Sequence, residues 1–191
     1  MQALIDKIVH DGLALGTQII KVDSFLNHQL DIDFIMQIGQ EFKRRFGDLQ
    51  PNKILTMESS GIACAMAVSM AYGNIPVVFA KKITPSTLVE EVYRAEIKSF
   101  TKGIISQAVV SSKFINPGDK LLIIDDFMAH GEAAKGLISI AKQGGAEVLG
   151  YGVVIEKEFQ GGGNKVRQSG VRLESLAIIK EINDGVITFR N

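Results

Sequence analysis

The chain has 191 residues, of which 46% are hydrophobic, and its 21 basic residues balance 21 acidic ones. This length and apolar content predict a single globular domain with a sizeable core. No apolar run approaches the roughly 18 residues that a membrane-spanning helix needs, and no leader with a small-residue cleavage site is visible. Cys64 alone permits no intrachain disulfide and no cluster of positive charge favours nucleic acid, so we expect a cytoplasmic protein with neither membrane nor nucleic-acid partners.

The N-terminal part of the chain is predicted to hold two helices and a short strand. Apolar residues at helical spacing predict a helix over 3–12 that ends at Gly12 in the left-handed conformation. A strand over 18–22 follows, and Asp31 or Asp33 is suited to cap the next helix. The apolar stripe of that helix consists of Ile32, Ile35, Met36, Ile38, Phe42 and Phe46.

Two strand–helix–strand units make up the centre of the chain. They are predicted at 53–57, 61–72 and 76–80, and at 120–125, 132–143 and 148–155. Such compact units favour right-handed parallel crossovers, so the predicted fold class is α/β with a mainly parallel sheet. The C-terminal segment adds a short helix ending at Gly170 and strands at 171–179 and 185–189.

The segment between the two units, residues 81–116, lacks a helical period. Polar and apolar residues alternate at 93–100 and again around 107–110. Because this alternation is typical of strands, we predict a projecting β-hairpin, or flap, in this segment.

Two acidic residues stand at the end of the most apolar strand of the chain. Asp125 and Asp126 follow Leu121 to Ile124, and the small-residue turn 129–133 then opens a helix. Backbone N–H groups at a helix N-terminus can hold a phosphate, while two carboxylates can reach diol hydroxyls or a hydrated cation. The alternative is an ordinary turn in which the acids cap the helix.

A second turn of the same kind follows the predicted strand at 53–57. Ser59, Ser60 and Gly61 connect the strand at 53–57 to a helix and form another cradle suited to an anion. An N-cap serine explains an isolated Ser-Ser-Gly equally well. Two such cradles separated by one parallel unit favour a site that binds two phosphate groups.

The acidic strand end resembles the motif of type I phosphoribosyltransferases that binds 5-phosphoribosyl diphosphate (PRPP). That motif has four apolar residues, two acids and a small-residue loop that usually reads Ala-Thr-Gly-Gly-Thr. This chain has Ala129, His130, Gly131, Glu132 and Ala133 instead, and the loss of both threonines resembles the xanthine phosphoribosyltransferase branch. The loop binds phosphate mostly through main-chain amides, so the missing hydroxyls weaken the assignment without abolishing it.

The resemblance implies a role for each of these segments. Asp125 and Asp126 would bind the ribose hydroxyls, and Ala129 to Ala133 would hold the 5′-phosphate. Ser59, Ser60 and Gly61 would receive the pyrophosphate, with a cis peptide between Ser59 and Ser60. The residues implied at the rest of the PRPP site are Lys81 or Lys82 at the pyrophosphate and Tyr93, Lys98, Ser99 and Phe100 on a flexible flap that closes over it. Mg²⁺ would be carried by PRPP near the two aspartates, with no direct protein ligand.

The segments 21–29 and 155–159 resemble the xanthine phosphoribosyltransferase subfamily more closely. The resemblance places Ile20, Asn27 and Lys157 at the purine. A lysine donates hydrogen bonds to purine carbonyl oxygens and rejects the amino group of adenine. Phe159 would stack on the base or, equally, lie in the core.

The resemblance covers the whole chain and implies the type I phosphoribosyltransferase fold in one domain. A core of about 31–156 would carry the PRPP site, and a base-binding hood would form from about 1–30 and 157–191. The implied enzyme is a homodimer that converts xanthine and PRPP to xanthosine monophosphate (XMP) and pyrophosphate in purine salvage. Guanine or hypoxanthine as the base is the first alternative. A PRPP-sensing purine regulator is the second, although the chain shows no DNA-binding segment.

Overall fold

The computed structural model describes residues 1–83, 91–99 and 104–190. Its α-helices are α1 (Gln2–Asp11), α2 (Ile32–Arg45), α3 (Gly61–Ala71), α4 (Glu132–Gln143) and α5 (Gly162–Gln168). Its strands are β1 (Leu13–Leu15), β2 (Ile19–Lys21), β3 (Lys53–Met57), β4 (Val77–Ile83), β5 (Val92–Ser99), β6 (Ile104–Ser111), β7 (Lys120–Met128), β8 (Glu147–Lys157), β9 (Leu173–Asn183) and β10 (Val186–Phe189). Over these residues, no helix is both long and apolar enough to cross a membrane.

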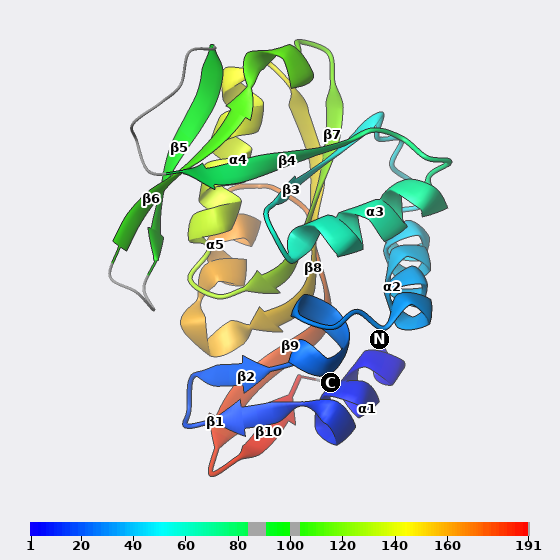
Figure 1. Cartoon of the computed structure of the whole chain (residues 1–191), viewed down its shortest axis with the longest axis vertical. Coiled ribbons are helices and arrows are strands. Elements are labelled where there is room, and N and C mark those ends of the chain that lie inside the picture. The colour runs from blue at the N-terminus through cyan, green and yellow to red at the C-terminus, as the bar shows by residue number, and fades with distance from the viewer. Residues whose placement is uncertain (84–90, 100–103, 191) are drawn as a thin grey trace.

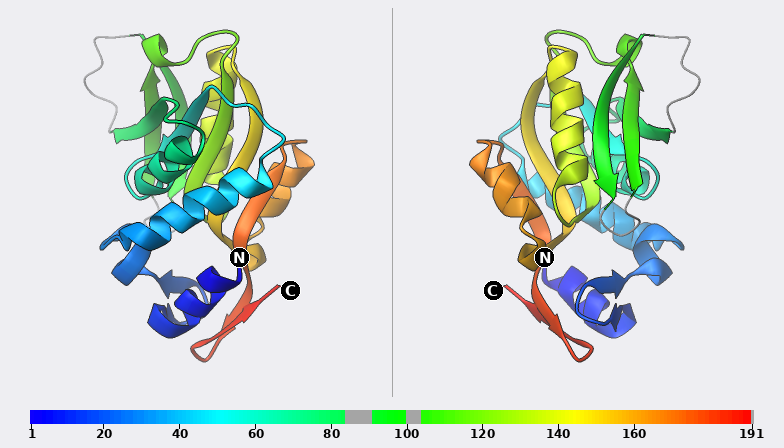
Figure 2. Two further views of the ribbon diagram at one scale, coloured as in Figure 1. Left: turned by 90° about the vertical axis from the view of Figure 1, so that its right-hand side faces the viewer. Right: turned by 90° about the vertical axis from the view of Figure 1, so that its left-hand side faces the viewer.

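A large twisted sheet forms the centre of the molecule (Figure 1). Within the described ranges it has eight strands in the order β10-β9-β8-β7-β3-β4-β6-β5. The five strands from β9 to β4 run parallel, and β10, β6 and β5 extend the sheet antiparallel at its two ends. Helices α2 and α3 cover one face, and α4 and α5 cover the other (Figure 2). The predicted α/β class with a mainly parallel sheet is therefore confirmed.

The central strands occur where continuous apolar runs predict them. β3 spans the five predicted residues, and α4 has the predicted bounds Glu132–Gln143. Ile54 and Leu55 are both fully buried although they are neighbours on β3, because the sheet is covered on both faces. Continuous burial explains why the run lacks the polar–apolar alternation of a half-exposed strand.

The first two helices differ from prediction in detail. Helix α1 ends as expected, but Gly12 has φ −84° and is not left-handed, because the chain continues directly into β1. A side chain there would overlap the carbonyl oxygen of Ile8, which explains the glycine. Asp31 caps α2 by accepting a hydrogen bond from Phe34 N at 3.1 Å. The apolar stripe is shifted: Ile32 is 58% exposed, whereas Phe34, which was not predicted, is 7% exposed.

The predicted flap is built into the edge of the main sheet. β4 continues past the predicted end at residue 80 and pairs with β6, which pairs in turn with β5. The hairpin also packs on α4, where Gln143 exchanges hydrogen bonds of 3.1 and 2.9 Å with the backbone of Arg94. Tyr93, Lys98 and Ser99 lie on β5, and Phe100 lies outside the described residues.

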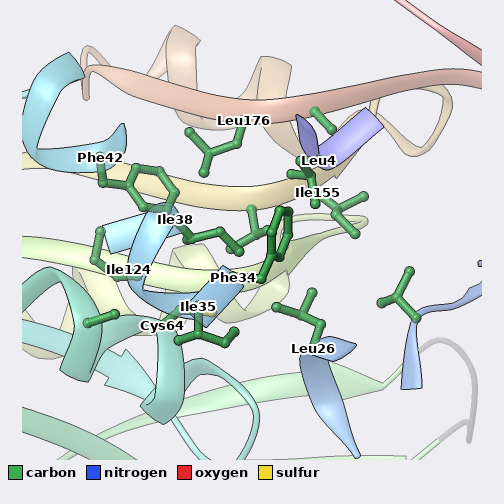
Figure 3. Packing of buried hydrophobic residues seen from close by; sticks show 14 of the residues in the cluster. Leu4, Leu26, Phe34, Ile35, Ile38, Phe42, Cys64, Ile124, Ile155 and Leu176 are labelled. Carbon is green, nitrogen blue, oxygen red and sulfur yellow. The ribbon is translucent and has the colours of Figure 1, made fainter. Parts of the chain in front are cut away.

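One hydrophobic cluster joins the N-terminal segment to the sheet (Figure 3). Leu4 of α1 and Leu26 lie in the same cluster as Ile38 of α2, Ile124 of β7 and Leu176 of β9. At the same end of the molecule, the two-stranded sheet β1–β2 lies beside the β9–β10 hairpin (Figure 1). The ends of the chain therefore share the core of the central sheet.

We predict that Gly39→Ala destabilises the protein. Gly39 lies at the contact between α2 and α3, where an added Cβ would come within 2.5 Å of the Ala67 carbonyl oxygen. Alanine favours an isolated helix by about 1 kcal/mol, but overpacking typically costs about 1–3 kcal/mol. Urea unfolding should show a net loss of stability for Gly39→Ala and a change within about 0.5 kcal/mol for the exposed neighbour Gln40→Ala. A more stable Gly39→Ala would show that the two helices separate freely.

Candidate active site

The two predicted aspartates lie at the carboxyl end of β7 in different environments. Asp125 is 4% exposed, whereas Asp126 is half-buried. The Asp125 carboxylate accepts one hydrogen bond from the Tyr151 hydroxyl and one from Asp126 N, both at 3.0 Å. Tyr151 is fully buried on the adjacent strand β8. Asp125 is thus fixed from within the sheet, while Asp126 lies nearer the surface.

Burial and charge affect the ionisation of this pair. Burial, together with the nearby Asp126 charge, raises the pKa of Asp125 well above its ordinary range, although the Tyr151 hydroxyl opposes the shift. Burial and the Asp125 charge likewise raise the pKa of Tyr151. Tyr151 was not predicted from the sequence, because a tyrosine in an apolar strand resembles any other core residue.

The loop 129–133 begins α4 and is supported by α5. Gly131 is the N-cap of α4 and has φ 85°, a left-handed conformation that suits glycine. From α5, Gly162 N donates to Ala129 O and Lys165 Nζ donates to His130 O, both at 3.0 Å. The glycines at 161–163 had no predicted role, although consecutive glycines indicate a close approach of two backbones.

The second loop lies directly beside the first acid. A Cβ on Gly61 would lie 3.1 Å from Asp125 Oδ1 and would overlap Thr56 Oγ1. Thr56 is fully buried, and its hydroxyl has no hydrogen-bond partner among the described residues. Gly61 therefore brings the start of α3 against the end of β7, and the two predicted cradles meet at one edge of the sheet.

The geometry of the second loop corrects one prediction. The cis peptide joins Glu58 and Ser59, one residue before the predicted Ser59–Ser60 bond. At this point Glu58 N still pairs with Ala80 O at 3.0 Å, and Glu58 Oε1 accepts a hydrogen bond from Lys82 N at 2.5 Å. The pairing of Glu58 with β4 brings the loop to the strand that carries the predicted lysines.

Lys81 and Lys82 are both exposed near the end of β4. They pair with Val109 and Ala108 of β6. Because side chains alternate along a strand, the two lysines point to opposite faces of the sheet. Only the lysine on the sheet face that would hold the pyrophosphate can therefore contact it.

The residues predicted at the base lie where the two ends of the chain meet. Lys157 Nζ donates to Gln18 O at 2.9 Å and lies 5.5 Å from the centroid of the Phe127 ring. Burial lowers the pKa of Lys157. Ile20 is buried on β2, and Phe159 is half-buried against the core cluster.

Two further features of this region were not predicted. Gln160 Nε2 donates to Gln18 Oε1 at 3.0 Å, and Gln160 Oε1 is buried without a partner among the described residues. Asn27 is exposed at the end of a π-helical turn, Asp23–Asn27, a conformation that is frequent at functional sites. The sequence carries no pattern that distinguishes this turn from a loop.

The donor groups of the site fit a magnesium ion that a substrate brings with it. Across the described ranges, no three His, Cys, Asp or Glu side chains are grouped to hold a metal. The half-buried Asp126 carboxylate offers oxygens that can accept hydrogen bonds from the water shell of a Mg²⁺ held by substrate phosphates. Cys64 is buried, and burial raises the pKa of its thiol, which fits its predicted packing role.

Comparison with solved structures defines the class of the protein. The adenine phosphoribosyltransferase of Rhodothermus marinus aligns with a TM-score of 0.74 over 94% of this chain and 100% of that chain, at 18% identity. That of Saccharomyces cerevisiae, complexed with adenine, aligns with a TM-score of 0.69 over 92% of this chain and 99% of that chain, at 17% identity. The fold is that of the type I phosphoribosyltransferases, as predicted.

Sequence relatives identify the family within that class. A xanthine phosphoribosyltransferase of Clostridium tetani is 50% identical over 190 residues, and the match covers 100% of both chains. One of Lactobacillus delbrueckii subsp. bulgaricus is 49% identical over 189 residues, covering 99% of this chain and 100% of the relative. No family model matches the chain. The chain belongs to the xanthine phosphoribosyltransferase family, which confirms the resemblance found in the sequence.

The raised pKa of Asp125 predicts how stability changes with pH. Folded Asp125 binds its proton more tightly than unfolded Asp125, so its ionisation lowers wild-type stability as pH rises above the ordinary value of 3.8. Asparagine cannot ionise. We therefore expect Asp125→Asn to gain stability relative to the wild type as pH rises above 3.8 in urea unfolding.

Asp119, at the other end of β7, provides the matched control. Burial raises the pKa of Asp119, but its hydrogen bonds with Lys53 and Asn116 outweigh burial and lower the pKa overall. Its contribution to stability is present above pH 3.8 and is lost as pH falls below it. Asp119→Asn should therefore lose stability relative to the wild type as pH rises. Parallel pH profiles for the two variants would contradict the raised pKa of Asp125.

Proposed function

We propose that this chain transfers the 5-phosphoribosyl group of PRPP to xanthine, giving XMP and pyrophosphate in purine salvage. The observation that carries the proposal is the meeting of two anion-binding loops at one acid pair, with Gly61 beside Asp125 and the loop 129–133 following it. Full-length relatives named xanthine phosphoribosyltransferase support xanthine as the base.

The reaction is a displacement at the anomeric carbon through a cationic transition state. The bond from this carbon to pyrophosphate breaks, a purine ring nitrogen forms the new bond, and that nitrogen loses its proton. Asp126 binds the ribose hydroxyls together with Asp125, which Tyr151 orients, and the negative charge of Asp126 stabilises the developing cation. Mg²⁺, when bound with PRPP, would neutralise charge on the leaving pyrophosphate.

The two loops hold the phosphate groups of PRPP. Residues 129–133 and the N-terminus of α4 take the 5′-phosphate, and Ser59, Ser60 and Gly61 take the pyrophosphate at the start of α3. Lys81 or Lys82 adds a positive charge from the end of β4. Closure of the flap would exclude water, which would otherwise quench the cation.

Lys157 and its neighbours select the base. The ammonium group has three donors, of which Gln18 O takes one, so others can reach the carbonyl oxygens of xanthine. Ile20 and Phe159 provide apolar surface for the ring, and Asn27 offers a further amide at the exposed π-helical turn. Adenine presents an amino donor where xanthine presents an acceptor, and the site therefore rejects it.

A homodimer and a cytoplasmic location stay predictions from the resemblance. Met66 and Met70, one turn apart on α3, are 49% and 48% exposed and offer apolar surface for a second copy. Sedimentation of a monomer at micromolar concentration would contradict the dimer.

A competition assay tests the proposed function directly. Purified protein is given PRPP, magnesium and equal amounts of xanthine, guanine, hypoxanthine and adenine, and the nucleotides formed are separated by chromatography. XMP should dominate. If guanosine or inosine monophosphate dominated instead, the roles of the two loops would stand but the assignment of xanthine as the base would be wrong. Absence of product, with PRPP still raising the melting temperature, would favour the regulatory alternative.

Lys157→Met should weaken the binding of xanthine but not that of PRPP. Hydrogen bonds to a charged donor contribute about 1.5–3 kcal/mol, so KM for xanthine should rise about tenfold or more while KM for PRPP stays unchanged. Steady-state kinetics with each substrate varied in turn would measure the two effects. Lys21→Met, at an exposed position on β2, serves as the control. An equal rise in both KM values would assign Lys157 a structural role through Gln18.

Asp126→Asn should lower turnover severely without unfolding the protein. The substitution removes negative charge beside the developing cation, and loss of one such group typically lowers kcat by about 100- to 1,000-fold. Asp184→Asn is the control. Asp184 lies in the exposed β9–β10 turn with φ 47°, a conformation that asparagine also tolerates, so this variant should keep wild-type kcat. Near-normal turnover of Asp126→Asn would exclude the proposed role.

A further inference from the structure

An ion pair between a buried carboxylate and a half-buried arginine joins α5 to the central sheet. Glu156 of β8 is 1% exposed and receives a two-pronged hydrogen bond from Arg167 of α5, with N···O distances of 2.8 and 2.7 Å. Ser175 of β9 donates its hydroxyl to the same carboxylate. Burial acts to raise the pKa of Glu156, but Arg167 and Ser175 outweigh it and lower the pKa overall. The carboxylate is therefore charged at neutral pH and depends on these donors.

The first turn of α5 rests directly on this ion pair. A Cβ on Gly163 would overlap Glu156 Oε1 and lie 2.8 Å from Arg167 Nη1. Glycine at this position allows the backbone of α5 to approach the carboxylate. A shift of the ion pair would therefore move the start of the helix.

The same turn of α5 holds the carbonyl groups of the loop that begins α4. Gly162 N bonds Ala129 O, and Lys165 Nζ bonds His130 O, each at 3.0 Å. A Cβ on Gly162 would come within 2.5 Å of Gly131 N, so the two backbones are in close contact. Figure 2 shows α5 beside α4 on one face of the sheet.

These bonds determine where the loop amides point. In a trans peptide the C=O of one residue and the N–H of the next point in opposite directions. Because Gly162 N and Lys165 Nζ bond the carbonyls of Ala129 and His130, the N–H group in each of these two peptides points away from the donor that bonds its carbonyl. The loop therefore presents these amides on its other side, as an anion site requires.

We propose that Glu156 and Arg167 are positioning residues for binding of the 5′-phosphate. They act through α5, which orients the amides of the loop 129–133 without touching the substrate. This inference rests on the proposed function for the identity of the phosphate. A purely structural ion pair would instead lower stability and affect both substrates alike.

The test compares binding of a phosphate probe with binding of the base. Ribose 5-phosphate carries the 5′-phosphate but neither pyrophosphate nor base, and its affinity can be measured by calorimetry. Arg167→Met should weaken the binding of ribose 5-phosphate and raise KM for PRPP, each by about tenfold, and should leave KM for xanthine unchanged. Arg167→Lys, which restores the charge with a single donor group, should recover part of the loss.

Arg172→Met is the matched control. Arg172 also makes a carboxylate pair, with Asp48 at 2.8 Å, but the pair is more exposed and lies apart from the loop. The control should leave ribose 5-phosphate affinity and both KM values at wild-type levels.

Lys165→Met provides a second test if Arg167→Met does not fold. Lys165 is exposed, so its replacement should preserve the fold, and loss of its bond to His130 O should weaken ribose 5-phosphate by about three- to tenfold. The inference would be overturned if a folded Arg167→Met bound ribose 5-phosphate with wild-type affinity. If Arg167→Met does not fold, wild-type affinity of Lys165→Met would overturn it. Equal losses of affinity for ribose 5-phosphate and for xanthine would overturn it too. Failure of the wild type itself to bind PRPP and ribose 5-phosphate would instead overturn the proposed function, and the inference with it.

Discussion

The organisation of the site depends on a carboxylate held inside an apolar sheet. Asp125 interrupts the buried run of β7, and a buried acid needs hydrogen-bond partners. Tyr151 and the backbone of Asp126 supply them, and Gly61 leaves the space into which the carboxylate projects. The same contacts bring the start of α3 against the end of β7. Two loops from distant parts of the chain therefore meet at one point.

Local sequence was sufficient to predict the elements that carry the loops. β3 and α4 have their predicted bounds because an apolar run and a glycine-bounded helix are local patterns. Gly12 and the predicted flap show the limit. The chain continues from Gly12 directly into β1, and the flap hairpin pairs with β4 and packs on α4. The partners of the site, Tyr151 and the glycines of α5, depend on contacts across 26 to 35 residues of chain, which no local pattern reveals.

The likeness in fold extends further than the likeness in sequence. The adenine phosphoribosyltransferases of Rhodothermus marinus and Saccharomyces cerevisiae share its fold at 18% and 17% identity, whereas the xanthine phosphoribosyltransferases match it at 48–50% over essentially the full length. The sheet and the helices on its two faces form the part of the fold that these proteins share. Lys157 ends β8 of that sheet and bonds to Gln18 just before β2, where the two ends of the chain meet.

The shared core has a consequence for engineering base selectivity. Leu4 and Leu26 pack in one cluster with the sheet residues Ile124 and Leu176. The N-terminal segment is therefore not an independent cassette that can be grafted from a relative to change the base. A chimera would keep a continuous interior only if the donor segment matched the recipient sheet in side-chain volume. Changes of selectivity should be sought first at exposed positions around the proposed base site, where they leave this packing intact.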